Sequence, residues 1–239
     1  MKRISAFLLA AGLLTTLSST ANAGPISINV GNFTGGTAVL HAPNTLANGL
    51  NVVLGAVILS GDLGTFEGYC VDLQHYDTPG ANAVTVDSMS NWNNTATPTP
   101  AGATPLNPGG AASWLYNTYA ASAAGHQDLE AALSLAIWNS LYDSDFSVSG
   151  GSGFWVTSVS IASAVGTAND MLAALYKAEK GSVSLPYDYL LRTQNFGTYY
   201  SQDFIAPVPE PAMMLLLGTG MAGVLGFRRR LTRKRAAAN

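Results

Sequence analysis

The sequence has little cysteine and little histidine. Its 239 residues include one cysteine, Cys70, and three histidines at positions 41, 75 and 126. A single cysteine excludes an intramolecular disulfide, so the fold has to be stabilised by packing. The histidines lie far apart and do not have the spacing of metal ligands. We therefore expect neither a metal site nor a cofactor.

The sequence motifs of several large enzyme classes are also missing. The chain has no Gly-x-Ser-x-Gly, no His-Glu-x-x-His and no phosphate-binding loop. Asp143-Ser144-Asp145 is similar to half of a calcium loop but lacks its glycine and distal glutamate. Cys70 and Asp72 share one face of a predicted strand, whereas His75 falls in the turn after it, which disfavours a Cys–His catalytic pair. We expect a protein that is not an enzyme.

Positive charge is almost confined to the two ends of the chain. Of eleven lysines and arginines, two precede residue 4 and six follow Phe227, which leaves Lys177, Lys180 and Arg192. Residues 24–206 contain these three basic residues and thirteen of the fourteen acidic ones, so this part of the chain has a formal charge of −10. Such a surface repels nucleic acid and anionic lipid, and we expect neither as a ligand.

The N-terminal residues have the pattern of a secretory signal peptide. Lys2 and Arg3 precede an apolar run over residues 6–14, and Ala21-Asn22-Ala23 offers small residues for cleavage after Ala23. We expect residues 1–23 to be removed on export. The mature chain then begins with residue 24, and residues 24–206 form one exported domain.

The C-terminal residues 207–235 have the pattern of a membrane-stop tail. Pro209, Glu210 and Pro211 precede sixteen uncharged residues, 212–227, and the basic cluster then starts with three arginines, Arg228, Arg229 and Arg230. Sixteen residues make about 24 Å of helix, somewhat less than the roughly 30 Å hydrocarbon core. We predict a single transmembrane helix that is a weak, temporary anchor in the inner membrane, with the arginines on the cytoplasmic side.

This order of a Pro-Glu-Pro triplet, an apolar run and an arginine cluster resembles the PEP-CTERM sorting signal of Gram-negative bacteria. The resemblance implies an exosortase as processing partner, which is thought to cleave at or near the triplet. It also implies a surface or extracellular-matrix protein of a producer of extracellular polysaccharide, with a role in biofilm or floc formation. An ordinary tail anchor with an incidental Pro-Glu-Pro is the alternative.

Residue periodicity in the exported domain predicts an α+β fold. Alternating or β-branched runs predict antiparallel strands at 26–33, 37–40, 51–60 and 65–73. Residues 91–110 are rich in Asn, Thr, Pro and Gly and predict a surface loop. Apolar residues at helical spacing predict helices at 112–121, 128–142 and 158–179, the second capped by Asp128. Predicted strands at 183–191 and 197–204 return to a barrel-like sheet, so the helices form an insertion.

Two segments of this domain resemble the thioester domains of bacterial surface adhesins. Tyr69-Cys70-Val71-Asp72 is similar to their Tyr-Cys-x-Asp strand, and Ser134-Leu135-Ala136-Ile137-Trp138 is similar to their helix with Gln-x-Ala-Ile-Trp. The resemblance implies an electrophile formed between a cysteine and a glutamine, which acylates amines on another surface. Ser134 stands at the glutamine position and has no acyl group, so we predict that the standard cross-link is lost.

Three interpretations of Cys70 remain open. It is a buried small hydrophobe, a reactive or intermolecularly oxidised thiol, or a thioester partner of another amide. Gln127 is the best alternative amide because it lies seven residues before Ser134, although a cap at Asp128 places it outside the helix. The sequence gives no support to Gln74, Gln194 or Gln202.

The sequence therefore predicts an exported structural or adhesive matrix protein, with two alternatives. One is a covalent thioester adhesin that uses Cys70. The other is a polysaccharide-binding module, for which Trp92 in its polar segment is the candidate, since Trp114 and Trp138 occupy apolar helical positions.

Overall fold

We describe a computed structural model of the chain over residues 26–75, 80–92, 107–151, 153–181, 188–193 and 202–207. The predicted signal peptide, residues 1–23, lies outside these residues. So do the sorting triplet Pro209, Glu210 and Pro211 and the arginines Arg228, Arg229 and Arg230.

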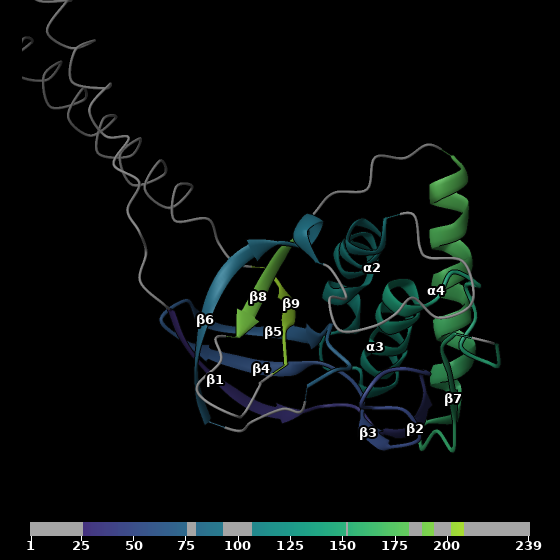
Figure 1. Ribbon diagram of the computed structural model, residues 1–239, viewed down its shortest axis with the longest axis horizontal. Helices are drawn as coiled ribbons and strands as arrows, with labels where there is room; N and C mark the ends of the chain where they lie inside the picture. The colour runs from purple at the N-terminus through teal and green to yellow at the C-terminus, as the bar shows by residue number, and fades with distance from the viewer. Residues whose placement is uncertain are drawn as a thin grey trace, which may run out of the picture.

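Six antiparallel strands form a closed barrel with the order β1-β4-β5-β9-β8-β6 (Figure 1). The strands are β1 (Ile26–Phe33), β4 (Val57–Gly61), β5 (Gly64–Cys70), β6 (Gly80–Ser88), β8 (Tyr189–Thr193) and β9 (Phe204–Ala206). Pairing of β1 with β6 closes the barrel, and β9, from the end of the described chain, inserts between β5 and β8. Closure leaves these strands without a free edge.

A second, three-stranded sheet lies beside the helices, with the order β3-β2-β7. It consists of β2 (Thr37–His41), β3 (Asn51–Val53) and β7 (Trp155–Thr157). Because β7 precedes the last helix, this sheet joins the first strands of the chain to the helical segment through the pairing of Leu40 with Val156.

Three helices form the other half of the domain, α2 (Pro108–Ala123), α3 (Gln127–Tyr142) and α4 (Ala162–Lys180). A 3-10 turn, η1 (Met89–Asn91), precedes them. Helix α3 lies between the barrel and α4 (Figure 1) and is buried from Glu130 to Tyr142. Alanine and leucine fill most of its positions, which allows close contact with neighbours on every side.

The predicted α+β class and antiparallel barrel-like sheet are confirmed, with corrections to the elements. The predicted strand 51–60 is two strands, β3 and β4, in different sheets, because Gly55 between them has a φ of +101°. The predicted loop 91–110 ends sooner, because α2 begins with Pro108 and Asn107 caps Gly110. Strands β6 and β7 were not predicted. Among the described residues, no helix is both long and apolar enough to cross a bilayer.

Candidate functional site

Cys70 ends strand β5 and is 1% exposed. The chain turns back over its sulfur immediately afterwards. Cys70 Sγ donates to the carbonyl oxygen of Asp72 at 3.2 Å, and the Asp72 N–H donates to the same sulfur at 3.4 Å. This burial agrees with one of the three interpretations from sequence, a buried small hydrophobe, and the choice among the three stays a prediction. The thiol is nonetheless held in a polar turn rather than in an entirely apolar core.

Gln202 lies beside this turn, on the segment that leads into β9. In the antiparallel pair of β5 with β9, Cys70 is opposite Phe204, and the Val71 N–H donates to the Asp203 carbonyl. Gln202 therefore faces Asp72, and its Nε2 donates to the Asp72 carbonyl oxygen at 3.2 Å. The Cys70 sulfur and the Gln202 amide nitrogen thus both donate to the Asp72 carbonyl oxygen, each at 3.2 Å. The distance between the sulfur and the nitrogen is therefore at most twice 3.2 Å.

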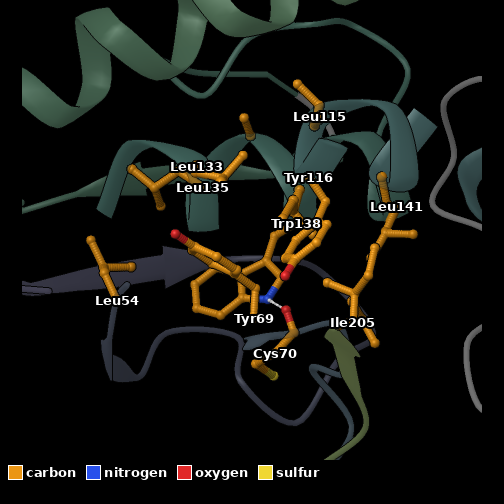
Figure 2. Close-up of a cluster of buried hydrophobic side chains, with 14 of the residues drawn as sticks. Leu54, Tyr69, Cys70, Leu115, Tyr116, Leu133, Leu135, Trp138, Leu141 and Ile205 are labelled. Carbon is orange, nitrogen blue, oxygen red and sulfur yellow. Dashed lines mark hydrogen bonds between the residues drawn. The ribbon is translucent and has the colours of Figure 1, made fainter. Parts of the chain in front are cut away.

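Helix α3 contacts the Cys70 strand through Trp138. The indole N–H of Trp138 donates to the Cys70 carbonyl oxygen at 2.8 Å, and the ring is 2% exposed. Figure 2 shows that this bond meets the backbone of Cys70, while the Cys70 side chain points away from the Trp138 ring. The helix with the adhesin-like sequence therefore contacts the backbone of the Cys70 strand.

The other proposed partners of Cys70 are placed as follows. Ser134 is 1% exposed on α3, one helical turn before Trp138, and its assignment as the position of a lost glutamine stays a prediction. Gln127 is inside α3, because His126 and not Asp128 is the N-cap, but Gln127 is exposed and Cys70 is buried. Gln74 donates to the Asn44 carbonyl at 3.2 Å. Gln194 lies outside the described residues.

His75 joins Asp72 beside the same turn. The His75 Nδ1 is hydrogen-bonded to Asp72 Oδ2, while Asp72 Oδ1 accepts the Gln74 N–H at 2.7 Å. Tyr142 supports the turn from α3, since its hydroxyl accepts the Leu73 N–H at 2.9 Å. Burial, followed by the nearby charge of Asp72, raises the pKa of Tyr142. The tyrosine hydroxyl therefore stays protonated at neutral pH.

The opposite side of β5 carries a second buried polar group. Tyr69 is 1% exposed, packs edge-to-face against Tyr116, and its hydroxyl is buried without a hydrogen-bond partner. Burial raises the pKa of Tyr69, and the charges of Glu130 and Glu67 add to the rise. Glu130, itself buried, accepts the Gly125 N–H at 2.7 Å. These contacts give Glu130 a role in holding the turn before α3.

The remaining candidates from sequence have structural roles. Trp92 donates to the Val71 carbonyl and lies edge-to-face with Tyr142, so its ring packs against the core instead of forming an open sugar platform. The Asp143 carboxylate accepts the Ser144 and Phe154 N–H groups at 2.7 Å each, which closes its loop. Within the described part of the chain, no cluster of three His, Cys, Asp or Glu side chains is suited to a metal ion.

Comparison with known proteins identifies the tail. Residues 207–230 match the family model of the PEP-CTERM protein-sorting motif. The chain is therefore a protein with a PEP-CTERM sorting motif, as the sequence predicted, and the motif indicates exosortase-dependent export. No curated protein and no solved structure matches the chain. The similarity of the exported domain to adhesin thioester domains stays a prediction.

Gln202 is an amide that the sequence analysis considered but for which it found no support. The strand predicted at 197–204 contained it, but a single sequence does not show which strand lies next to which. The sequence did not show that this last strand pairs with the Cys70 strand. The structure shows it, because Cys70 pairs with Phe204.

Proposed function

We propose that this protein is exported, processed by an exosortase at its PEP-CTERM tail, and released as a structural or adhesive component of an extracellular polysaccharide matrix. The motif match over residues 207–230 carries the proposal. In this account, residues 1–23 direct export and the apolar segment 212–227 holds the chain at the inner membrane. Cleavage near Pro209, Glu210 and Pro211 then separates the acidic domain from its basic tail.

The experiment is a substitution of Pro209, Glu210 and Pro211 by alanine in the producing cells. We expect the wild-type domain in the extracellular fraction and the variant in the cell envelope, where its tail remains attached. Replacement of Gln127 by alanine, at an exposed position outside the motif, is the control and leaves release unchanged. Normal release of the triplet variant would contradict the proposal.

We propose covalent adhesion as a second candidate function, because Gln202 and Cys70 share one hydrogen-bond acceptor. In the first step, Cys70 Sγ attacks Gln202 Cδ, the sulfur–carbon bond forms, the carbon–nitrogen bond breaks, and ammonia leaves with the thiol proton. In the second step, a primary amine of another surface attacks the same carbon, forms an amide, and returns the thiol.

The intact mass of the protein purified from the producing cells decides this second candidate. A thioester lowers the mass by one ammonia, and treatment with methylamine adds one methylamine back to the chain. Gln202→Ala abolishes both changes, whereas Gln127→Ala, at an exposed position, retains them. A wild-type protein with the full mass and a Cys70 that reacts with thiol reagents would exclude the thioester.

A further inference from the structure

Strand β3 is paired on one side only. It pairs with β2, and among the described residues no strand pairs with its other side. Along the chain β3 leads into β4, which pairs with both β1 and β5. The chain of β1 continues into β2 and stays bonded to this segment, since the Gly35 N–H donates to the Leu54 carbonyl at 3.0 Å. Strand β5 instead ends with Cys70, so no strand continues from it along β3.

The hydrogen bonds between β2 and β3 show which residues of β3 face the open side. The Leu54 N–H and the Leu50 carbonyl both bond to the segment of β2, at 2.8 and 3.0 Å. In an antiparallel pair, residues that bond to the partner strand alternate with residues that do not. The even-numbered residues of this segment therefore face β2. The backbone N–H and carbonyl groups of Asn51 and Val53 face the open side.

A cavity of about 260 Å³ lies along this open side. Asn51, Val52 and Val53 all line it, although successive side chains of a strand lie on opposite faces. One cavity contacts all three residues only along an edge of the strand, and β2 occupies the other edge. Cys70 and Gln202 line the same cavity. The cavity therefore lies between β3 and the end of β5, in the place that a longer β5 would occupy.

The walls of this cavity are mainly apolar. They include Phe33, Leu73 and Trp138, which come from the barrel, the turn after β5 and helix α3. A dry apolar cavity of about 150 Å³ in another protein holds benzene. A cavity of about 260 Å³ therefore has room for a branched or aromatic side chain.

The opening of the cavity is apolar and has no charged strand residue beside it. Leu50 and Val53 line the cavity and are 39% and 47% exposed. Strands β2, β3 and β7 contain no Asp, Glu, Lys or Arg. Charged side chains are one of the means by which edge strands avoid pairing with other chains, and this sheet lacks them. The open edge of β3 is therefore suited to pairing.

We infer that β3 binds an extended peptide segment of a partner protein by strand addition. The segment lies where a longer β5 would lie, its backbone pairs with Asn51 and Val53, and one branched or aromatic side chain enters the cavity. Because residues 24–206 have a formal charge of −10, basic residues at the ends of the segment favour its approach. This binding site goes beyond the proposed function and does not depend on a thioester.

The test is a titration of the protein purified from the producing cells with a fluorescent peptide, acetyl-Lys-Val-Phe-Val-Lys-amide. We expect Asn51→Pro to weaken binding about ten-fold, from the loss of one backbone hydrogen bond to the peptide. Proline is tolerated at the first residue of an edge strand, which is the position of Asn51. Asn51→Ala keeps the N–H group, so it is the matched control and binds as the wild type does. A peptide with alanine in place of phenylalanine binds at least about ten-fold more weakly.

Amide hydrogen exchange of the wild type gives a second measurement that needs no variant. We expect bound peptide to slow exchange at Asn51 and Val53 and to leave exchange at Val52, which faces β2, unchanged. Exchange that is equal with and without the peptide overturns the inference, as does equal binding by Asn51→Pro and Asn51→Ala.

Three further results also overturn it. One is no binding of the peptide below about 1 mM. Another is slow exchange at Asn51 and Val53 in the free monomer, which shows that another segment of the same chain covers the edge. The third is slow exchange that appears only as the protein dimerises, which shows that a second copy covers it.

Discussion

Trp138 is the residue that joins helix α3 to the Cys70 strand. Its N–H bond to the Cys70 carbonyl is 2.8 Å long and buried. Trp138→Phe keeps most of the ring but leaves that carbonyl without its indole donor. We expect a loss of about 2 kcal/mol in the free energy of unfolding, from the lost indole hydrogen bond and the smaller ring. Urea denaturation measures this loss, and Trp114→Phe, at a partly buried position, is the control with a smaller effect.

Asp188 is expected to make the stability of the folded protein depend on pH. Partial burial raises the pKa of Asp188 to about 6, although the Asn117 amide opposes the rise. The folded state therefore binds more protons than the unfolded state, in which the pKa is about 3.9. The contribution of Asp188 to stability is fully present below about pH 4 and is lost as the pH rises through about 6.

Replacement of Asp188 by asparagine therefore stabilises the protein at pH 7.5 but not at pH 4. After a discount for solvent screening, we expect a gain of less than about 1 kcal/mol. Thermal unfolding at the two pH values measures it, with Asp170→Asn, at an exposed helical position, as control. An equal shift at both pH values would contradict the assignment to Asp188.

Residue-level roles were only partly predictable from the sequence. The burial of Trp138 follows from its position among apolar residues at helical spacing, and it was predicted. The contact of Gln202 with the Asp72 carbonyl joins residues 130 positions apart, and nothing local encodes it. The same is true of Trp92, whose polar sequence neighbours predicted exposure, whereas its indole N–H reaches the Val71 carbonyl.

Gly55 decides how the first strands divide between the two sheets. Its φ is +101°, and a Cβ there would lie 2.4 Å from the Gly35 nitrogen. Gly55→Ala therefore combines an unfavourable backbone conformation with a clash against another backbone segment. We expect a loss of about 2 kcal/mol in the free energy of unfolding.

Gly166, in the interior of helix α4, is the matched control for Gly55. A Cβ at Gly166 meets no atom within 4 Å, so Gly166→Ala should stabilise the protein by about 0.5 to 1 kcal/mol. Chemical denaturation of the two variants should thus give changes of opposite sign. A Gly55→Ala protein as stable as the wild type would contradict the role of Gly55 at the β3–β4 junction.

Elements with a long, regular pattern were predicted well, whereas short strands were not. The helical spacing of apolar residues predicted α3 and α4 to within a few residues at their starts. The run 51–60 is apolar on both sides of Gly55, so its pattern contains no sign of the break. Assignment of β3 and β4 to different sheets depends on contacts with distant strands, which the periodicity of one segment does not contain.

At the scale of the whole molecule, charge is divided between a domain and a tail. Residues 24–206 contain thirteen acidic residues and three basic ones, whereas six basic residues follow Phe227. The sorting motif was predictable because its triplet, apolar run and arginines follow one another directly in the sequence. Its recognition therefore does not depend on any tertiary contact. Cleavage at the triplet is expected to remove the basic tail and leave an acidic protein.

The intact mass of the protein released by the producing cells tests this account most directly. We predict one chain that begins with residue 24 and ends near Pro209, Glu210 and Pro211, without the arginines Arg228, Arg229 and Arg230. A released protein that still contains these arginines would contradict exosortase processing.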